Sequence, residues 1–243
     1  MIERTIYIKE FNKSNVVLID YRAKRAEVEL IKLGMQVVKT PPLDVAYDSV
    51  CGHPDMMFHR LDEASAVCSP ESFDYFKEKI PSMNIICGVK KIGREYPFDI
   101  AYNVARVGRT ALHKFSYTEP EILEYYNKNN IKLINVNQGY SKCSVCVVND
   151  EAIITSDQGI YNSAKGELDV LLVKAGYVKL KNMPYGFIGG ASGIIDGTLV
   201  FNGNIKEHSD YNNIKSFCAN HHVNIYPLHD GDLEDIGSVI QLF

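Results

Sequence analysis

The fold is decided by residues 16–38, whose sequence is VVLIDYRAKRAEVELIKLGMQVV. The stretch begins with the apolar run Val16–Asp20, which is typical of a buried strand. In the next segment, 21–33, apolar residues recur at spacings of three and four, as on the buried face of a helix. Gly34 ends this helix, because glycine is the preferred residue just beyond a helix C-terminus. A second apolar run, Met35–Val38, follows. These residues therefore predict a strand–helix–strand unit.

The same pattern recurs along the rest of the chain. Five helices are predicted, at about 21–33, 69–80, 118–126, 157–166 and 209–222. A short apolar strand follows each helix, at 35–38, 83–86, 131–134, 169–172 and 223–226. The starts at 35, 83, 131, 169 and 223 are 48, 48, 38 and 54 residues apart. A spacing this regular indicates internal duplication, and a repeat of this kind governs the fold.

Each repeat continues through a loop rich in Gly, Pro and Asp to two further strands joined by a tight turn. The second strands are predicted at Met56–His59, Tyr102–Val107, Ser144–Val148, Gly193–Ile195 and Ser238–Leu242. The third strands are predicted at Ser65–Cys68, Thr110–His113, Ala152–Thr155 and Thr198–Phe201. Two of the turns, Asn149-Asp150 and Asp196-Gly197, have residues that favour hairpins.

The fifth repeat ends at Phe243 without a third strand, whereas Val16–Asp20 is a spare strand placed directly before the first helix. We expect Val16–Asp20 to pair with Ser238–Leu242 and to close a ring, because closure removes exposed strand edges. The prediction is thus an α/β fold in which residues 1–243 form a single domain of five repeats. The alternative is an open α/β sheet, which leaves the missing strand and the spare strand unrelated.

Five such units closing head to tail resemble the pentein superfamily of guanidino-group-modifying enzymes, a five-fold pseudo-symmetric α/β propeller. Five strings in equivalent loops resemble a bacterial family of unknown function within that superfamily: Ser49–Asp55, Ile100–Ala105, Gln138–Ser144, Gly186–Gly193 and Asp235–Ser238. The resemblance implies a small-molecule ligand in a central channel. It also implies three catalytic parts: a carboxylate that holds a guanidinium, a cysteine nucleophile and a histidine that moves protons.

Composition narrows the classes of partner. The formal net charge of −4 argues against nucleic acid, which binds to basic surfaces. No run of apolar residues is long enough for a membrane span. The start of the chain has no basic region followed by an apolar one, so a cytoplasmic protein without a signal peptide is expected. The six cysteines are accordingly expected to be reduced thiols. Nothing in the sequence predicts the oligomeric state.

The five loop strings supply the candidate site. The ends of equivalent loops converge in a ring, and eight polar residues there are expected around one hole: His53, Asp55, Asn103, Gln138, Lys142, Cys143, Ser192 and Ser238. Asp55 lies in the string that resembles the carboxylate segment of the enzymes, so it is the candidate for cation binding. Its alternative role is to bond the backbone of its own loop.

The other two catalytic parts are not where the resemblance places them. The third-repeat loop has Lys142 and Cys143 where the relatives have histidine, and the fifth-repeat loop has Ser238 where they have cysteine. A rearranged site would use Cys143 as nucleophile, with a pKa lowered by Lys142, and His53 as the acid–base group. Alternatively, Cys143 is a small packing residue at the start of a strand.

Metal and cofactor chemistry is not expected. Cys143 and Cys146 have CxxC spacing, but residues three apart on a strand face opposite sides, and no second pair completes a zinc site. The glycine-rich loop Gly186–Gly193 lacks the Lys-Ser/Thr pair of a nucleotide-binding loop.

Two functional readings remain. The first is an amidino-group hydrolase or a transferase acting on a guanidino or ureido small molecule. The second is a non-catalytic pentein that binds a ligand or a protein partner.

Overall fold

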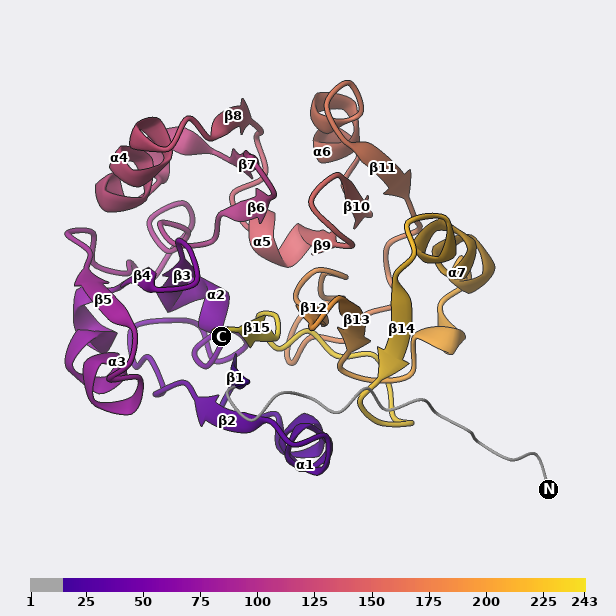
Figure 1. The fold of residues 1–243 in the computed structure, drawn as a ribbon, viewed down its shortest axis with the longest axis horizontal. Coiled ribbons are helices and arrows are strands. Elements are labelled where there is room, and N and C mark those ends of the chain that lie inside the picture. The colour runs from indigo at the N-terminus through magenta and orange to yellow at the C-terminus, as the bar shows by residue number, and fades with distance from the viewer. Residues whose placement is uncertain (1–14) are drawn as a thin grey trace.

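The computed structural model describes residues 15–243, which form five three-stranded sheets. Figure 1 shows the sheets arranged around a common centre, each with a helix on its outer side. The first strands of the five sheets lie nearest the centre. They are β3 (Phe58–Arg60), β6 (Ala105–Val107), β9 (Val145–Val147), β12 (Ser192–Ile195) and β15 (Ile240–Gln241). The middle strands are β4 (Ser65–Cys68), β7 (Thr110–His113), β10 (Ala152–Thr155), β13 (Thr198–Phe201) and β1 (Val16–Ile19). The third strands are β5 (Asn84–Cys87), β8 (Lys132–Asn135), β11 (Asp169–Leu172), β14 (Asn224–Pro227) and β2 (Gln36–Lys39).

Every sheet has the same internal pattern. The middle strand runs antiparallel to the strand nearest the centre and parallel to the outer one. The parallel pair is joined by a crossover helix, as parallel strands require. These helices are α3 (Phe73–Lys79), α4 (Pro120–Lys128), α6 (Gln158–Ala164), α7 (Tyr211–Asn220) and α1 (Lys24–Lys32). Short 3-10 turns precede three of them: η1 (Pro70–Ser72), η2 (Phe115–Tyr117) and η3 (Ile205–Glu207).

The fifth sheet joins the two ends of the described chain. β1 pairs antiparallel with β15, with Val17 opposite Gln241 and Leu18 opposite Ile240, and it pairs in parallel with β2. The expected pairing of Val16–Asp20 with Ser238–Leu242 is therefore confirmed, and the strand order β15-β1-β2 matches the other four sheets.

The core lies between the helices and the sheets. Each crossover helix contributes a fully buried side chain: Leu30, Phe76, Tyr126, Ile160 and Ile214 all have 0% exposure. Complete burial of such a side chain contributes about 1.5–3 kcal/mol. The middle strands are almost entirely buried as well, since they are covered on both faces. This packing fixes the strands that carry the loops of the site.

Two segments differ from the sequence prediction in a way that affects the site. The expected strands at Met56–His59 and Ser144–Val148 begin later, after the helical turns α2 (Pro54–Met57) and α5 (Ser141–Ser144). Pro54 opens α2 with a backbone angle suited to a helix, and the Ser144 amide closes α5 by donating to the Tyr140 carbonyl at 2.9 Å. Neighbouring side chains on a helical turn point about 100° apart, not to opposite faces as on a strand.

No helix in residues 15–243 is both long enough and apolar enough to cross a membrane.

Candidate active site

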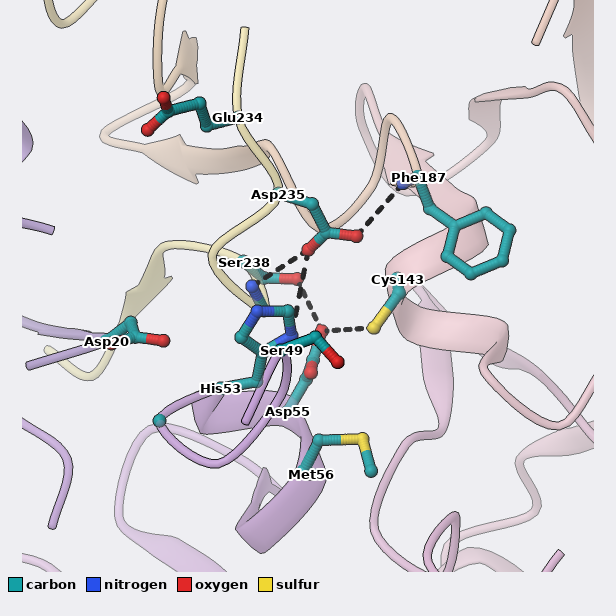
Figure 2. Close-up of polar contacts among 12 residues, drawn as sticks. Asp20, Ser49, His53, Asp55, Met56, Cys143, Phe187, Glu234, Asp235 and Ser238 are labelled. Carbon is teal, nitrogen blue, oxygen red and sulfur yellow. Dashed lines mark hydrogen bonds and ion pairs between the residues drawn. The ribbon is translucent and has the colours of Figure 1, made fainter. Parts of the chain in front are cut away.

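Five polar side chains meet where loops of three repeats converge (Figure 2). His53 and Asp55 come from the start of α2, Cys143 from α5, and Asp235 and Ser238 from the loop before β15. Their exposed fractions are 1%, 1%, 3%, 6% and 0%, so the group is closed off from solvent. We call these five residues the central cluster. Buried polar groups are costly unless they are paired, so their contacts decide what the cluster can do.

Asp55 links the first repeat to the third and fifth. Its Oδ2 atom accepts a hydrogen bond from Ser238 Oγ at 2.9 Å and one from Cys143 Sγ at 3.1 Å. Its Oδ1 atom is buried and has no hydrogen-bond partner among the described residues. The carboxylate therefore keeps one unused acceptor facing the interior of the site. It does not serve its own loop, which was the alternative role considered from the sequence.

Cys143 is held in place by Asn103. The Asn103 amide donates to Cys143 Sγ at 3.1 Å, and its oxygen accepts from the backbone amides of Lys142 and Cys143. Burial, together with the negative charges of Asp55 and Asp235, raises the pKa of the Cys143 thiol well above its ordinary value. The raised pKa favours the protonated thiol at neutral pH.

His53 and Asp235 form the other half of the cluster. His53 Nδ1 lies 3.7 Å from Asp235 Oδ1, and both ring nitrogens are buried without a hydrogen-bond partner. Asp235 is held by the backbone amides of Phe187 and Gly237, at 2.9 and 3.0 Å. Burial raises the pKa of Asp235, and Asp55 adds to this effect, whereas His53 opposes it.

A cysteine, a histidine and an acid therefore lie within reach of one another. One ligand atom from each of Cys143, His53 and Asp235 lies within 4.8 Å of the other two. This is the set of groups from which an activated thiol nucleophile is built. Asp235 was not among the candidates chosen from the sequence, although the string Asp235–Ser238 was. The sequence could have indicated Asp235, because a histidine that transfers protons needs a second group to orient it, and Asp235 is the carboxylate in the string Asp235–Ser238.

Lys142 lies beside the cluster and contacts its member Ser238. Lys142 Nζ donates to Ser238 Oγ at 2.9 Å, and Ser238 also lies 3.1 Å from the Gly189 carbonyl. Because α5 is a helical turn, Lys142 and Cys143 both reach the Asp55–Ser238 pair. The expectation that Lys142 lowers the pKa of Cys143 is not met, since the pKa of the thiol is raised.

Two of the eight sequence-predicted residues lie outside these contacts. The Ser192 hydroxyl donates to the Gly189 carbonyl at 3.1 Å. Gln138 is turned away: its amide donates to Asp157 at 3.1 Å and its oxygen accepts from the Tyr140 amide, at a separate surface cavity. Gln138 belongs to the loop before α5, where local turn bonds use its side chain. Hydrogen bonds join five of the other predicted residues in a continuous chain, in the order Asn103, Cys143, Asp55, Ser238 and Lys142. The sixth, His53, lies beside Asp235.

The glycine-rich loop shapes the floor of the site. A Cβ on Gly190 would overlap the Asp235 carboxylate, and a Cβ on Gly189 would overlap the Lys142 and Val145 carbonyls. Gly237, which has a φ of +68°, packs directly against His53. Gly190 and Gly237 therefore allow the backbone to approach Asp235 and His53 closely, and Gly189 allows two stretches of backbone to meet.

The central cluster lies between two cavities. One, of about 910 Å³, is lined by residues from the first strands of all five sheets and reaches Asp55, Lys142 and Ser192. The other, of about 810 Å³, is lined by Asp235 and by other residues within the segments 176–184 and 229–236. Of the eight residues expected around one hole, Asp55, Lys142 and Ser192 line the first cavity, whereas Asn103 and Cys143 are buried beside it and bond each other. Both cavities are large enough for a small-molecule ligand.

The charges of the cluster are not balanced. Within residues 15–243, neither Asp55 nor Asp235 has a Lys or Arg nitrogen within 4.0 Å. Lys142 contacts Asp55 only through Ser238. A positively charged group entering the site would supply the missing partner.

Comparison with known proteins places the fold. A family described as "Family of unknown function (DUF6873)" matches residues 18–240. No curated protein matches the sequence. DDAH from Pseudomonas aeruginosa complexed with citrulline aligns with a TM-score of 0.55 at 7% identity, over 87% of this chain and 91% of that one. SxtG, an amidinotransferase from Microseira wollei in the saxitoxin biosynthetic pathway, aligns with a TM-score of 0.56 at 10% identity, over 96% of both chains. At these identities the likeness shows the fold alone, and it confirms the pentein resemblance.

Proposed function

The chain belongs to the family of unknown function DUF6873, and we propose that it acts on the guanidino or ureido group of a small molecule through Cys143, His53 and Asp235. The observation that carries the proposal is the meeting of a thiol, an imidazole and a carboxylate beside a second, unpaired carboxylate in a pentein fold. Cys143 and His53 lie in other repeats than the cysteine and the histidine expected from the enzymatic relatives. A thiol, an imidazole and a carboxylate are nevertheless all present.

Asp55 and Asp235 would hold the substrate. A guanidinium is a planar, donor-only cation, and it fits acceptors such as the unused Oδ1 of Asp55. Burial is the main cause of the raised pKa of Cys143, and the charges of Asp55 and Asp235 add to it; the positive charge of the substrate would offset those two charges. Substrate binding would therefore favour the thiolate at the moment when it is needed.

The chemistry follows from these positions. His53 takes the thiol proton, and Cys143 Sγ attacks the central carbon of the bound group to give a tetrahedral adduct. His53 then gives the proton to the leaving nitrogen, whose C–N bond breaks, and a covalent S–C intermediate remains. Attack of water on that carbon, followed by cleavage of the C–S bond, regenerates the thiol in a hydrolase; an amine in place of water gives a transferase. Asp235 orients His53 throughout and stabilises its protonated form.

The organisation of the chain is the second part of the proposed description. We propose that the five sheets form one closed, pseudo-symmetric propeller spanning residues 1–243 as a single domain, of which 1–14 lie outside the described residues. The β1–β15 pairing supports closure. A reducing, cytoplasmic compartment fits the six free cysteines.

Turnover assays test the enzymatic proposal. Arginine, agmatine and citrulline analogues are incubated with the chain, and release of ammonia or amine and formation of ureido product are measured. Cys143→Ser and His53→Gln are expected to lower turnover at least a hundredfold, whereas Cys87→Ser, at an exposed thiol, is the matched control and stays active. Turnover that survives in Cys143→Ser would reject the assignment of the nucleophile.

The second candidate is a pentein that binds a ligand or a protein partner without turning it over. The observation that favours it is the raised pKa of Cys143 in a site that is closed to solvent. Absence of product in every assay, together with saturable binding of a guanidino compound, would decide for this function.

A further inference from the structure

Side chains that can ligate a metal ion are gathered in the central cluster in a way that guanidinium binding does not require. Cys143, His53 and Asp235 each offer one ligand atom, and these three atoms lie within 4.8 Å of one another. An ion with four tetrahedral ligands at about 2.0–2.3 Å separates them by roughly 3.5 Å, so small side-chain rotations bring the three atoms onto one ion. A guanidinium needs only acceptors such as carboxylates, whereas a thiolate and an imidazole are preferred ligands of zinc.

His53 gives an independent indication of a ligand. Its exposed fraction is 1%, and neither ring nitrogen has a hydrogen-bond partner. Most buried polar atoms in folded proteins are bonded, so two unpartnered nitrogens in one ring call for an explanation. A Cβ on Gly237 would overlap the Cα, Cβ and Cγ atoms of His53, so this glycine lets the backbone pack closely against the base of the side chain. One nitrogen already lies toward Asp235, at 3.7 Å.

The negative charge of the cluster also favours a bound cation. Asp55 and Asp235 are both buried without a Lys or Arg partner within 4.0 Å in residues 15–243. A divalent ion would supply two positive charges beside carboxylates that no Lys or Arg of residues 15–243 contacts directly. Asp55 Oδ1 is free to accept from a water bound in the fourth position.

We propose that Cys143, His53 and Asp235 bind a divalent transition-metal ion of the zinc type, with the fourth position facing Asp55. The site goes beyond the proposed function, because the ion would occupy these residues whether or not they carry out catalysis. It also revises the expectation from the sequence that no metal binds. If the chain is an enzyme, the ion excludes the cationic substrate and holds the thiolate, so metal and substrate compete.

Cobalt titration tests the site directly. The full chain is treated with a chelator, desalted without oxygen and titrated with Co²⁺ alone. The expected result is one ion per chain, with the near-ultraviolet sulfur-to-cobalt charge-transfer band and the intense visible bands of four-coordinate cobalt, and displacement of Co²⁺ by Zn²⁺. Absence of stoichiometric binding overturns the proposal.

Variants separate the site from other thiols. Cys143→Ser is expected to remove the charge-transfer band, and His53→Gln is expected to weaken binding at least tenfold. Cys87→Ser, at an exposed cysteine, leaves the spectrum unchanged. Thermal unfolding of each variant shows whether it is folded; a band that persists in folded Cys143→Ser overturns the assignment of the ligands.

The two proposals at this site fail separately. A chain that turns over a guanidino substrate but binds no Co²⁺ rejects only the metal site. A chain that binds Co²⁺ through Cys143 but shows no turnover after metal removal rejects only the enzymatic proposal.

Discussion

Charge-selective labelling of Cys143 is the sharpest test of how the cluster recognises a ligand. Chloroacetamidine and chloroacetamide have nearly the same shape and the same leaving group, but the first is a cation and the second is neutral. Cys143 Sγ lies 3.1 Å from Asp55 Oδ2, so an amidinium that reaches the sulfur also reaches the carboxylate. We expect the cation to label Cys143 faster than the neutral reagent.

The size of the preference follows from the distance. Opposite unit charges about 4 Å apart attract by about 1 kcal/mol in water and by about 4 kcal/mol at an effective dielectric constant of about 20. Since about 1.4 kcal/mol corresponds to a factor of ten, the preference is expected to lie between about 5-fold and about 1,000-fold. Cys87 is an exposed thiol of the same chain and serves as the internal reference for the intrinsic reactivity of the two reagents.

The assay is peptide mapping by mass spectrometry after metal removal, with rates at Cys143 divided by those at Cys87. Asp55→Asn keeps the shape of the side chain and removes its charge, so it is expected to lower the preference at least about fivefold. Thermal unfolding confirms that the variant is folded. A normalised preference of one, or one that Asp55→Asn leaves unchanged, would refute the role of Asp55 as the cation-binding group.

Three further predictions concern stability. Burial lowers the pKa of His59 to about 3 and that of His113 to about 4, below their ordinary value of 6.5, so below pH 6.5 the unfolded chain binds more protons than the folded one. The stability that these two histidines contribute should therefore be fully present above pH 6.5, and the free energy of unfolding should fall by about 1.4 kcal/mol per pH unit for each histidine as the pH drops toward 4. In urea denaturation, His59→Gln should reduce the slope of the free energy of unfolding against pH by the equivalent of one proton. Gly190→Ala places a Cβ against Asp235 and is expected to cost about 1–3 kcal/mol in chemical denaturation, whereas the control Gly166→Ala has open space around it and should be neutral or slightly stabilising; equal effects would contradict the packing argument. Leu18→Ala in β1 is expected to cost about 2–5 kcal/mol, and deletion of 240–243, which removes β15, should likewise lower the urea midpoint; an unchanged midpoint after deletion would mean that the β1–β15 pairing does not stabilise the fold.

The repeat could be read from the sequence because it depends on local patterns. Apolar spacing of three to four residues, strand-length apolar runs and turn residues are each fixed within about ten residues of chain. The spare strand Val16–Asp20 was informative because a strand edge must be covered, and the β1–β15 pairing shows how it is covered. The same reasoning placed Cys143, His53 and Asp55 together, since equivalent loops of a ring end at one place.

What local pattern could not decide is where individual side chains point. The Phe187 amide, which is 48 positions away in the sequence, donates to Asp235 and, together with the local bond from the Gly237 amide, holds this carboxylate beside His53. Gln138 was grouped with the site by its position in the repeat, but its own turn bonds direct it to Asp157. Cys143 was expected at the start of a strand, whereas the Tyr140–Ser144 backbone bond makes a helical turn and brings both Cys143 and Lys142 to the Asp55–Ser238 pair. The sequence by itself determined which elements form and in what order they repeat. Tertiary contacts alone decided the direction of each polar side chain in the cluster, because the groups that surround a buried side chain come from loops that are distant in the sequence.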